Sequence, residues 1–218
     1  MLLSMDRELL HIIGVTLRMS FFSTLISCTL GITLGVLIGQ KSFKGKRTVN
    51  KITGTLMGLP PVVAGLIVYM LFTRYGVFGE LKLLFTVEVM VIAQCLLITP
   101  VVINLTQSVI SSNAAIIRET AVGLNFTAAK RLRLLLNENR QALLSVVLNA
   151  FGRSIAEVGA VSLVGGNIQW KTRVMTTAIM LETNKGNFSF ALALGIILLV
   201  ISLIVNIIAN LLVKEEKR

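Results

Sequence analysis

Charged side chains are scarce in this chain. Asp, Glu, Lys and Arg make up 14% of its 218 residues, whereas 55% of the residues are hydrophobic. Soluble domains carry roughly 25% charged residues. A soluble globule of this length could not hide so many apolar side chains, so the composition excludes an ordinary soluble protein and makes lipid the natural solvent.

Residues that bind metals are also few. His11 has no Cys or His partner at ligand spacing, and Cys28 and Cys95 both fall inside apolar runs, where they are interpreted as small fillers. No catalytic triad or metal cluster can be assembled from this set. We therefore expect no metal site, no cofactor and no enzymatic activity in the chain itself.

Acidic residues number 10 against 21 basic ones, which gives a net charge of +11. A basic balance can indicate nucleic-acid binding. Here, however, the basic residues lie in short loops between apolar runs, as they do in membrane proteins. The expected partner is therefore a lipid bilayer and not a nucleic acid.

Apolar runs near the length of a membrane-spanning helix, about 20 residues, predict an all-α integral membrane protein of about five spans. They cover residues 12–39, 54–73, 87–110, 141–165 and 189–213. The starting segment MLLSMDRELLHIIG could form a short interfacial helix before the first span. Pro60-Pro61 and Pro100 lie inside runs, and each is expected to bend its helix. No internal repeat or linker divides the chain, so residues 1–218 are interpreted as one transmembrane domain.

The charges between the runs predict their orientation, because basic loops stay in the cytoplasm. Residues 40–53 carry five basic residues and no acid, and residues 111–140 carry five against two acids. Residues 74–86 hold two basic residues and one acid. We therefore expect the N-terminus outside and the C-terminus inside.

Small residues recur at helical spacing in two runs. Gly31, Gly35 and Gly39 share one helix face. A second stripe in the fourth run consists of Gly152, Ala156 and Ala160. Such stripes let two backbones approach closely where lipid supplies no hydrophobic drive, so both are expected at helix contacts.

Residues 111–140 are much less apolar than their neighbours and are interpreted as two short helices. Asn113 is the expected cap of the first, AAIIRETAVGL, and Asn125 its end, because Asn tolerates the left-handed conformation. Thr127 is the expected cap of the second, AAKRLRLLL. A simple connection between two spans does not need two structured helices. The pair therefore favours a protruding knob that docks onto a partner protein. The alternative is an interfacial amphipathic helix.

The stretch ETAVGLN, residues 119–125, resembles the EAA motif of ATP-binding-cassette importer permeases, in which Glu-Ala-Ala is followed after three residues by Gly. Glu119 and Ala121 match the motif, and Asn125 stands at the Gly. Thr120 replaces the first Ala, and the Ile-x-Leu-Pro ending of the motif appears here as LLNE. Residues 16–20 resemble the entry to the first core helix of such permeases, and residues 151–182 are similar to the molybdate, sulfate and tungstate permeases of this group, most of all to tungstate permeases.

The resemblance implies a type I importer permease in which residues 111–140 form a cytoplasmic coupling loop seated in a separate ATPase subunit. The residues expected at that contact are Glu119, Thr120, Ala121, Gly123 and Asn125. The resemblance further implies an extracytoplasmic oxyanion-binding protein and a second permease copy, in the simplest case as a homodimer. It places the protein in the cell membrane of a prokaryote.

Arg153 and Glu157 lie i, i+4 in the middle of the fourth run. A charge at that depth costs about 2.5–3.5 kcal/mol and must face the bundle interior. We expect Arg153 near the anion path, with Glu157 tempering its charge; the alternative is a structural ion pair that fixes helix register. The hydroxyls of Ser154, Thr176 and Thr177 could donate to an oxyanion on the same path or merely bond to helix backbone.

Residues 165–172, GGNIQWKT, superficially match a phosphate-binding loop of the form G-x-x-x-x-G-K-[ST]. Trp170 stands where the second Gly must be, and no strand precedes the loop. The chain is therefore not expected to bind ATP itself.

Together these patterns predict the permease subunit of an ATP-driven oxyanion importer, most specifically for tungstate, working by alternating access. A molybdate or sulfate permease of the same build stays open, because oxyanions of similar size and charge cannot be separated on one sequence. A membrane-embedded enzyme would show clustered His, Asp or Glu, and a stand-alone channel would not need the cytoplasmic knob.

Overall fold

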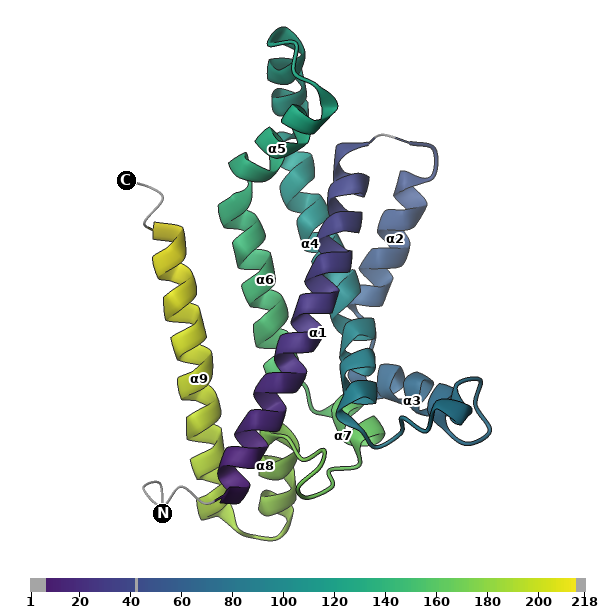
Figure 1. Ribbon diagram of the computed structural model, residues 1–218, viewed down its shortest axis with the longest axis vertical. Helices are drawn as coiled ribbons and strands as arrows, with labels where there is room; N and C mark the ends of the chain where they lie inside the picture. The colour runs from purple at the N-terminus through teal and green to yellow at the C-terminus, as the bar shows by residue number, and fades with distance from the viewer. Residues whose placement is uncertain (1–6, 42, 215–218) are drawn as a thin grey trace.

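The computed structural model describes residues 7–41 and 43–214, and every regular element in them is a helix, which confirms the all-α class. Figure 1 shows a bundle with α5 at one end and α3, α7 and α8 at the other. In chain order the helices are α1 (Arg7–Gln40), α2 (Lys46–Met57), α3 (Pro61–Phe72), the 3₁₀ turn η1 (Gly79–Leu81), α4 (Val87–Gly123), α5 (Ala128–Glu138), α6 (Arg140–Ile155), α7 (Gly159–Gly165), α8 (Met175–Asn184) and α9 (Phe188–Lys214).

In the described residues, α1, α4 and α9 are each long and apolar enough to cross a bilayer. Two more spans exist if each of two bent pairs, α2 with α3 and α6 with α7, counts as one; the helix axes turn by 95° and 54°. The predicted runs are thus helical, but the second and fourth are broken. The orientation of the bundle stays a prediction.

The first span is simpler than predicted. Helix α1 is continuous over 34 residues from Arg7, so the described part of the expected interfacial helix forms its first turns. Residues 1–6 of that expected helix lie outside the described residues.

The sharp bend between α2 and α3 follows from Pro60-Pro61. Proline pushes the residue before it out of the helical region, and Pro60 is extended, with φ −61° and ψ 130°. Helix α3 then restarts with Pro61 at its first position, where a missing N–H costs nothing. The predicted bend at this site is confirmed, whereas α4 continues through Pro100 as one helix.

The glycine stripe of α1 packs directly on α4, as predicted. A Cβ built on Gly31 would lie 2.6 Å from Val102 Cγ1, and one built on Gly35 would lie 2.6 Å from Thr106 Cβ. A Cβ on Gly39 would lie 2.8 Å from Ile110 Cγ2. The two backbones therefore approach more closely than any other residue type would allow.

The second predicted stripe, Gly152, Ala156 and Ala160, does not lie along one helix. Helix α6 ends at Ile155, with Ala156 as its C-cap, and α7 begins at Gly159. Ala160 packs instead against α3, where a Cβ on Gly65 would lie 2.7 Å from its Cα. A Cβ on Gly152 would meet nothing within 4 Å, so this part of the prediction is wrong.

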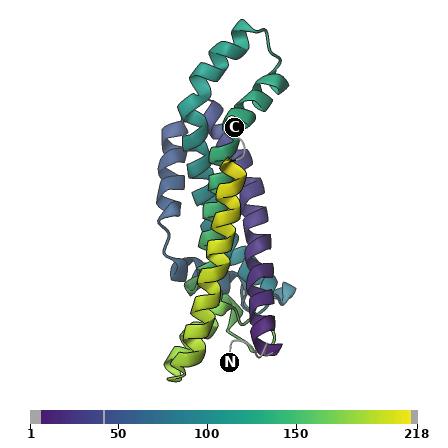
Figure 2. The ribbon, with the colours of Figure 1, turned by 90° about the vertical axis from the view of Figure 1, so that its left-hand side faces the viewer.

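The predicted two-helix knob is a hairpin, here called the α4–α5 hairpin, made of residues 111–138. Its first arm is not a separate helix, because α4 runs without a break to Gly123. At about 1.5 Å per residue the 37-residue helix exceeds the thickness of a bilayer core. Figure 2 shows both arms projecting beyond the rest of the bundle.

At the opposite end, the connection between the fourth and fifth predicted runs contains α8. Arg173 Nη1 lies 2.8 Å from Glu8 Oε1 and ties the segment before α8 to α1. Glu182 accepts from Lys185 Nζ at 2.8 Å and from Asn187 Nδ2 at 2.9 Å. The bond from Lys185 is the main reason why the pKa of Glu182 lies below its ordinary value.

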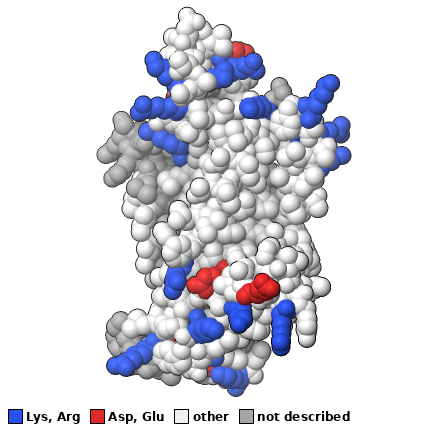
Figure 3. Space-filling view, turned by 45° about the vertical axis from the view of Figure 1, so that its right-hand side comes forward, with Lys and Arg blue, Asp and Glu red and all other residues white. Residues whose placement is uncertain are grey.

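The charged side chains mark the two ends of the molecule. Figure 3 shows, on one face, a wide belt without Lys, Arg, Asp or Glu below a basic end that carries the α4–α5 hairpin. Apolar side chains are also exposed along the spanning helices: Leu199 of α9 is 71% exposed. Such a belt is typical of a lipid-facing surface.

Candidate translocation path and coupling loop

The tip of the α4–α5 hairpin is fixed by a helix-terminating motif. Phe126 N–H donates to the Ala121 carbonyl at 2.8 Å, and Asn125 N–H donates to the Val122 carbonyl at 3.0 Å. Asn125 is left-handed, with φ 52°. These are the bonds of a Schellman motif, in which glycine is the usual left-handed residue. Asn125 therefore performs the conformational role predicted for it.

The predicted coupling residues gather around this tip. Ala121 is buried, whereas Glu119, Thr120, Gly123 and Asn125 are exposed. Glu119 and Gly123 also line a surface hollow on α4. A Cβ on Gly123 would meet nothing within 4 Å, so its small size is not required by the chain's own packing. Thr127 caps α5 as predicted, accepting from Lys130 N–H at 3.4 Å.

A pair of asparagines braces the base of the hairpin. Asn113 does not cap a helix, because it lies inside α4. Its Nδ2 donates instead to Asn139 Oδ1 at 3.0 Å. Asn139 is only 3% exposed and its Nδ2 donates to the Leu135 carbonyl at 2.8 Å. This bracing joins α4, α5 and the start of α6, and no helical spacing predicts it, because the two asparagines are 26 residues apart.

Arg153 lies in the last turn of α6 and Glu157 lies in the break between α6 and α7, so the two do not share a helix face. Glu157 Oε1 accepts from Ala160 N–H at 3.1 Å, at the start of α7. Within the described residues no ion pair joins the two side chains, and the buried Nε of Arg153 has no hydrogen-bond partner. The expected i, i+4 pairing is therefore wrong, since the helix that would support it ends at Ile155.

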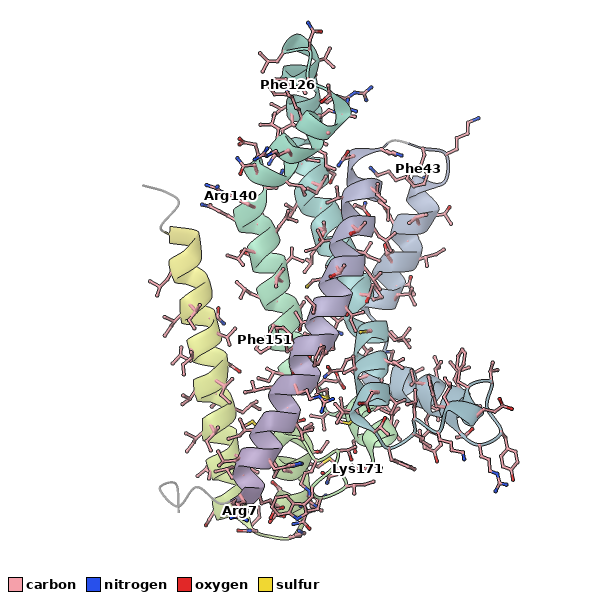
Figure 4. All side chains as sticks on the ribbon, viewed as in Figure 1. Arg7, Phe43, Phe126, Arg140, Phe151 and Lys171 are labelled. Atoms are coloured by element: carbon pink, nitrogen blue, oxygen red, sulfur yellow. The ribbon has the colours of Figure 1, made fainter. Side chains whose placement is uncertain are left out.

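Arg153 opens instead onto a polar groove of about 470 Å³ between α6 and α9. Helix α6 contributes Ser145 and Asn149, two turns and one turn before Arg153, and α9 contributes Ser202 and Asn206. Figure 4 shows Phe151 on the same part of α6. The spacing of Ser145, Asn149 and Arg153 at i, i+4 and i+8 is a usable sequence signal for this polar face, which the predicted pairing of Arg153 with Glu157 did not include.

The three predicted hydroxyls are engaged inside the protein. Ser154 Oγ donates to Gln94 Oε1 at 2.8 Å and lies 2.8 Å from Ser23 Oγ, while Gln94 Nε2 donates to the Ser154 carbonyl. Thr176 Oγ1 donates to the Glu157 carbonyl at 2.9 Å, and Thr177 Oγ1 to the Val174 carbonyl. In this conformation these hydroxyls hold the broken span in place and do not line the groove of Arg153.

The loop that mimics a phosphate-binding motif is a connection between α7 and α8. Gly166, Asn167 and Trp170 all have positive φ. Thr172 Oγ1 donates to the Gly165 carbonyl and accepts from Ile168 N–H, so its hydroxyl is already used. His11 packs edge-on against Trp170, with ring centroids 5.5 Å apart.

Known proteins of similar sequence are transport proteins. A probable anion ABC transporter permease protein of Haloferax volcanii is 37% identical over 88% of this chain and 85% of its own length. The tungstate uptake system permease protein TupB of Peptoclostridium acidaminophilum is 36% identical over 93% of this chain and 89% of its own.

The fold is also known. A chain of the MetNI methionine ABC transporter, solved in inward facing conformations, superposes with a TM-score of 0.79 over 98% of each chain at 16% identity. The family described as binding-protein-dependent transport system inner membrane component matches residues 31–218. With most of the chain matched in sequence and its helices arranged as in an ABC transporter subunit, this protein belongs to that family of membrane components.

Proposed function

We propose that this chain is the permease subunit of an ATP-driven tungstate importer in a prokaryotic cell membrane. It receives the oxyanion from an extracytoplasmic binding protein and passes it inward by alternating access. The observation that carries the proposal is the full-length similarity to a tungstate permease. Molybdate and sulfate permeases of the same build are the alternative, because these anions share size, shape and charge.

A separate ATPase subunit drives the cycle through residues 111–140, the coupling loop. The contact with the ATPase consists of Glu119, Thr120, Ala121, Gly123 and Asn125. The support is mechanical: the tip is locked by its Schellman bonds and the base by the Asn113–Asn139 bond. A rigid hairpin that continues a spanning helix can transmit closure of the ATPase to the membrane as a change of packing.

Two copies of the permease enclose the path, and Arg153 supplies a positive charge to it. Supporting this, α9 is largely exposed along its apolar length, and the groove of Arg153 opens beside it. The break between α6 and α7, next to Arg153, is shaped by Thr176, Thr177, Ser154 and Glu157. An exchange of the internal hydrogen bonds of the three hydroxyls for bonds to the oxyanion would accompany opening of the bundle.

The substrate is tested by uptake of radiolabelled tungstate in cells that express the complete system, with unlabelled molybdate or sulfate as competitor. We expect saturable tungstate uptake that requires the permease and the ATPase. Molybdate and sulfate are expected to compete only at higher concentration. Uptake of sulfate or molybdate in preference to tungstate would reassign the substrate within the family, and the absence of any oxyanion uptake would refute the importer.

Arg153→Met is expected to reduce oxyanion uptake about 10- to 100-fold, the factor for losing one hydrogen bond from a charged group, about 1.5–3 kcal/mol. The protein should stay folded, because no ion pair in the described residues is broken. Arg47→Met, which removes the same charge from an exposed arginine outside the groove, is the matched control and should transport normally. Uptake and detergent-extracted folded protein are measured together. Normal uptake by Arg153→Met would remove Arg153 from the path.

The proposed orientation predicts a labelling pattern. After both free cysteines are replaced, Tyr75→Cys should react with a membrane-impermeant thiol reagent in intact cells, because Tyr75 is 96% exposed at the proposed outer end. Lys44→Cys should react only after permeabilisation. Labelling of Lys44→Cys in intact cells would invert the assignment.

A further inference from the structure

A second hollow, of about 380 Å³, lies at the basic end of the molecule, between the end of α1 and the α4–α5 hairpin. Three cations from three segments line it: Lys41 after α1, Arg118 of α4 and Arg131 of α5. Apolar side chains complete the lining: Phe43, Ile117 and Leu135. Figure 4 shows Phe43 in the α1–α2 connection beside the hairpin. We call this the basic hollow.

The cations of the basic hollow are not neutralised by acids within the described residues. The salt bridges among the described residues lie elsewhere: they join Arg18 to Glu88, Arg173 to Glu8 and Lys185 to Glu182. Lys46, and not Lys41, covers the carbonyls at the end of α1, because its Nζ donates to the carbonyls of Lys41 at 2.9 Å and Gly39 at 3.4 Å. Lys41 therefore stays available to a ligand, together with the two arginines.

The apolar part of the lining indicates what kind of anion fits. Ile117 and Leu135 are buried, while Phe43 is partly exposed at the rim. The hollow also begins where the apolar run of α1 ends. Gly39 is still packed against Ile110 of α4, and the first charged residue after it, Lys41, directly follows the end of α1 at Gln40. That is the depth at which headgroups lie above the hydrocarbon core. A phospholipid presents a phosphate and an apolar stem at this depth, whereas a soluble anion presents only charge.

We propose that the basic hollow binds the phosphate headgroup of an anionic phospholipid. Basic pockets between membrane helices recognise such headgroups, and the planar guanidinium groups of Arg118 and Arg131 can each donate two hydrogen bonds to a phosphate. The bound lipid would link the end of α1 to the hairpin that we propose contacts the ATPase. Lipid composition would then influence how firmly the hairpin is held, independently of the transported anion.

The test compares two variants of the full chain that lose the same charge at the same end. The first carries Lys41→Gln, Arg118→Gln and Arg131→Gln. The control carries Lys44→Gln, Arg47→Gln and Lys51→Gln, three exposed residues outside the hollow. Binding of dioleoylphosphatidylglycerol, with dioleoylphosphatidylcholine as reference, is measured on detergent-purified protein by native mass spectrometry.

We expect binding of phosphatidylglycerol to weaken about fivefold for each charge removed from the hollow, and so roughly a hundredfold in the triple variant. The control variant should lose much less, and the reference lipid should bind both alike. A third variant, Lys41→Arg with Arg118→Lys and Arg131→Lys, keeps the charge and should bind clearly more tightly than the glutamine variant although it loses the bidentate bonds, which guards against a folding defect.

Several results would overturn the proposal. Equal losses in the hollow variant and the control would indicate diffuse attraction to the basic end. Inorganic phosphate that displaces phosphatidylglycerol from the hollow would reassign the site to a soluble anion. Unchanged lipid binding, with loss of the co-purifying ATPase subunit, would make the hollow a protein contact.

Discussion

Replacing Gly123 by tryptophan is expected to reduce transport by at least about tenfold, corresponding to about 1.4 kcal/mol, while the subunit still inserts and folds. A Cβ at this position meets nothing within 4 Å in the chain itself. The large side chain therefore has room in the isolated subunit and obstructs only a partner seated at the tip of the hairpin. Uptake, co-purification of the ATPase and substrate-stimulated ATP hydrolysis are the measurements, and all three should fall.

Two variants separate this effect from a general cost of tryptophan. Gly14→Trp places the same side chain on an exposed part of α1 that also has open space, and should transport normally. Gly123→Ala adds only a methyl group and should be tolerated. If the Gly123→Trp complex assembles and hydrolyses ATP normally, the ATPase does not seat at this tip.

Replacing Gly35 by leucine is expected to prevent correct folding of the bundle. Even a Cβ would lie 2.6 Å from Thr106 Cβ and 2.8 Å from the Ile103 carbonyl oxygen. The obstacle includes backbone, so a change of rotamer cannot relieve it, and α1 must move away from α4. Overpacking of this kind costs about 1–3 kcal/mol for small additions. Gly35→Ala should lower thermal stability by that amount, and Gly35→Leu should leave little monodisperse protein.

Gly195 provides the matched control for Gly35. It also lies inside a long apolar helix, but a Cβ there meets nothing within 4 Å. Gly195→Ala should raise stability slightly, because alanine favours a helix over glycine by about 1 kcal/mol. The two alanine variants are thus expected to change the melting temperature in opposite directions. A Gly35→Ala protein as stable as the parent would show that the α1–α4 contact is looser than described.

Local signals predicted the parts of the coupling loop that depend on neighbouring residues. Asn125 adopts the left-handed conformation and Thr127 caps α5, as expected. Asn113 was misjudged as a cap, because it can equally donate to a partner 26 residues away. The sequence does not reveal that Asn139 is present at that point in space.

The prediction for the translocation path was less accurate, again because it used only residues that are close together in the sequence. Arg153 and Glu157 have the spacing of a helical pair, but the helix ends between them. At this helix end the Ser154 carbonyl accepts from Gln94 Nε2, and Ser154 Oγ lies against Ser23 Oγ, 131 residues away in the chain. A spacing rule assumes a continuous helix, so it failed where contacts from other helices stabilise a break.

From the amino-acid sequence alone one can predict the membrane class, the apolar runs, the glycine face of α1 and the bend at Pro60-Pro61. Each of these depends on composition or on residues within a few positions of one another. Packing between distant helices, by contrast, sets where the fourth span breaks, brings Arg153 to a groove beside α9, and places Lys41, Arg118 and Arg131 around one hollow. Those outcomes depend on which helices pack together, because a helix end or an unpaired charge is stable only beside the distant groups that surround it.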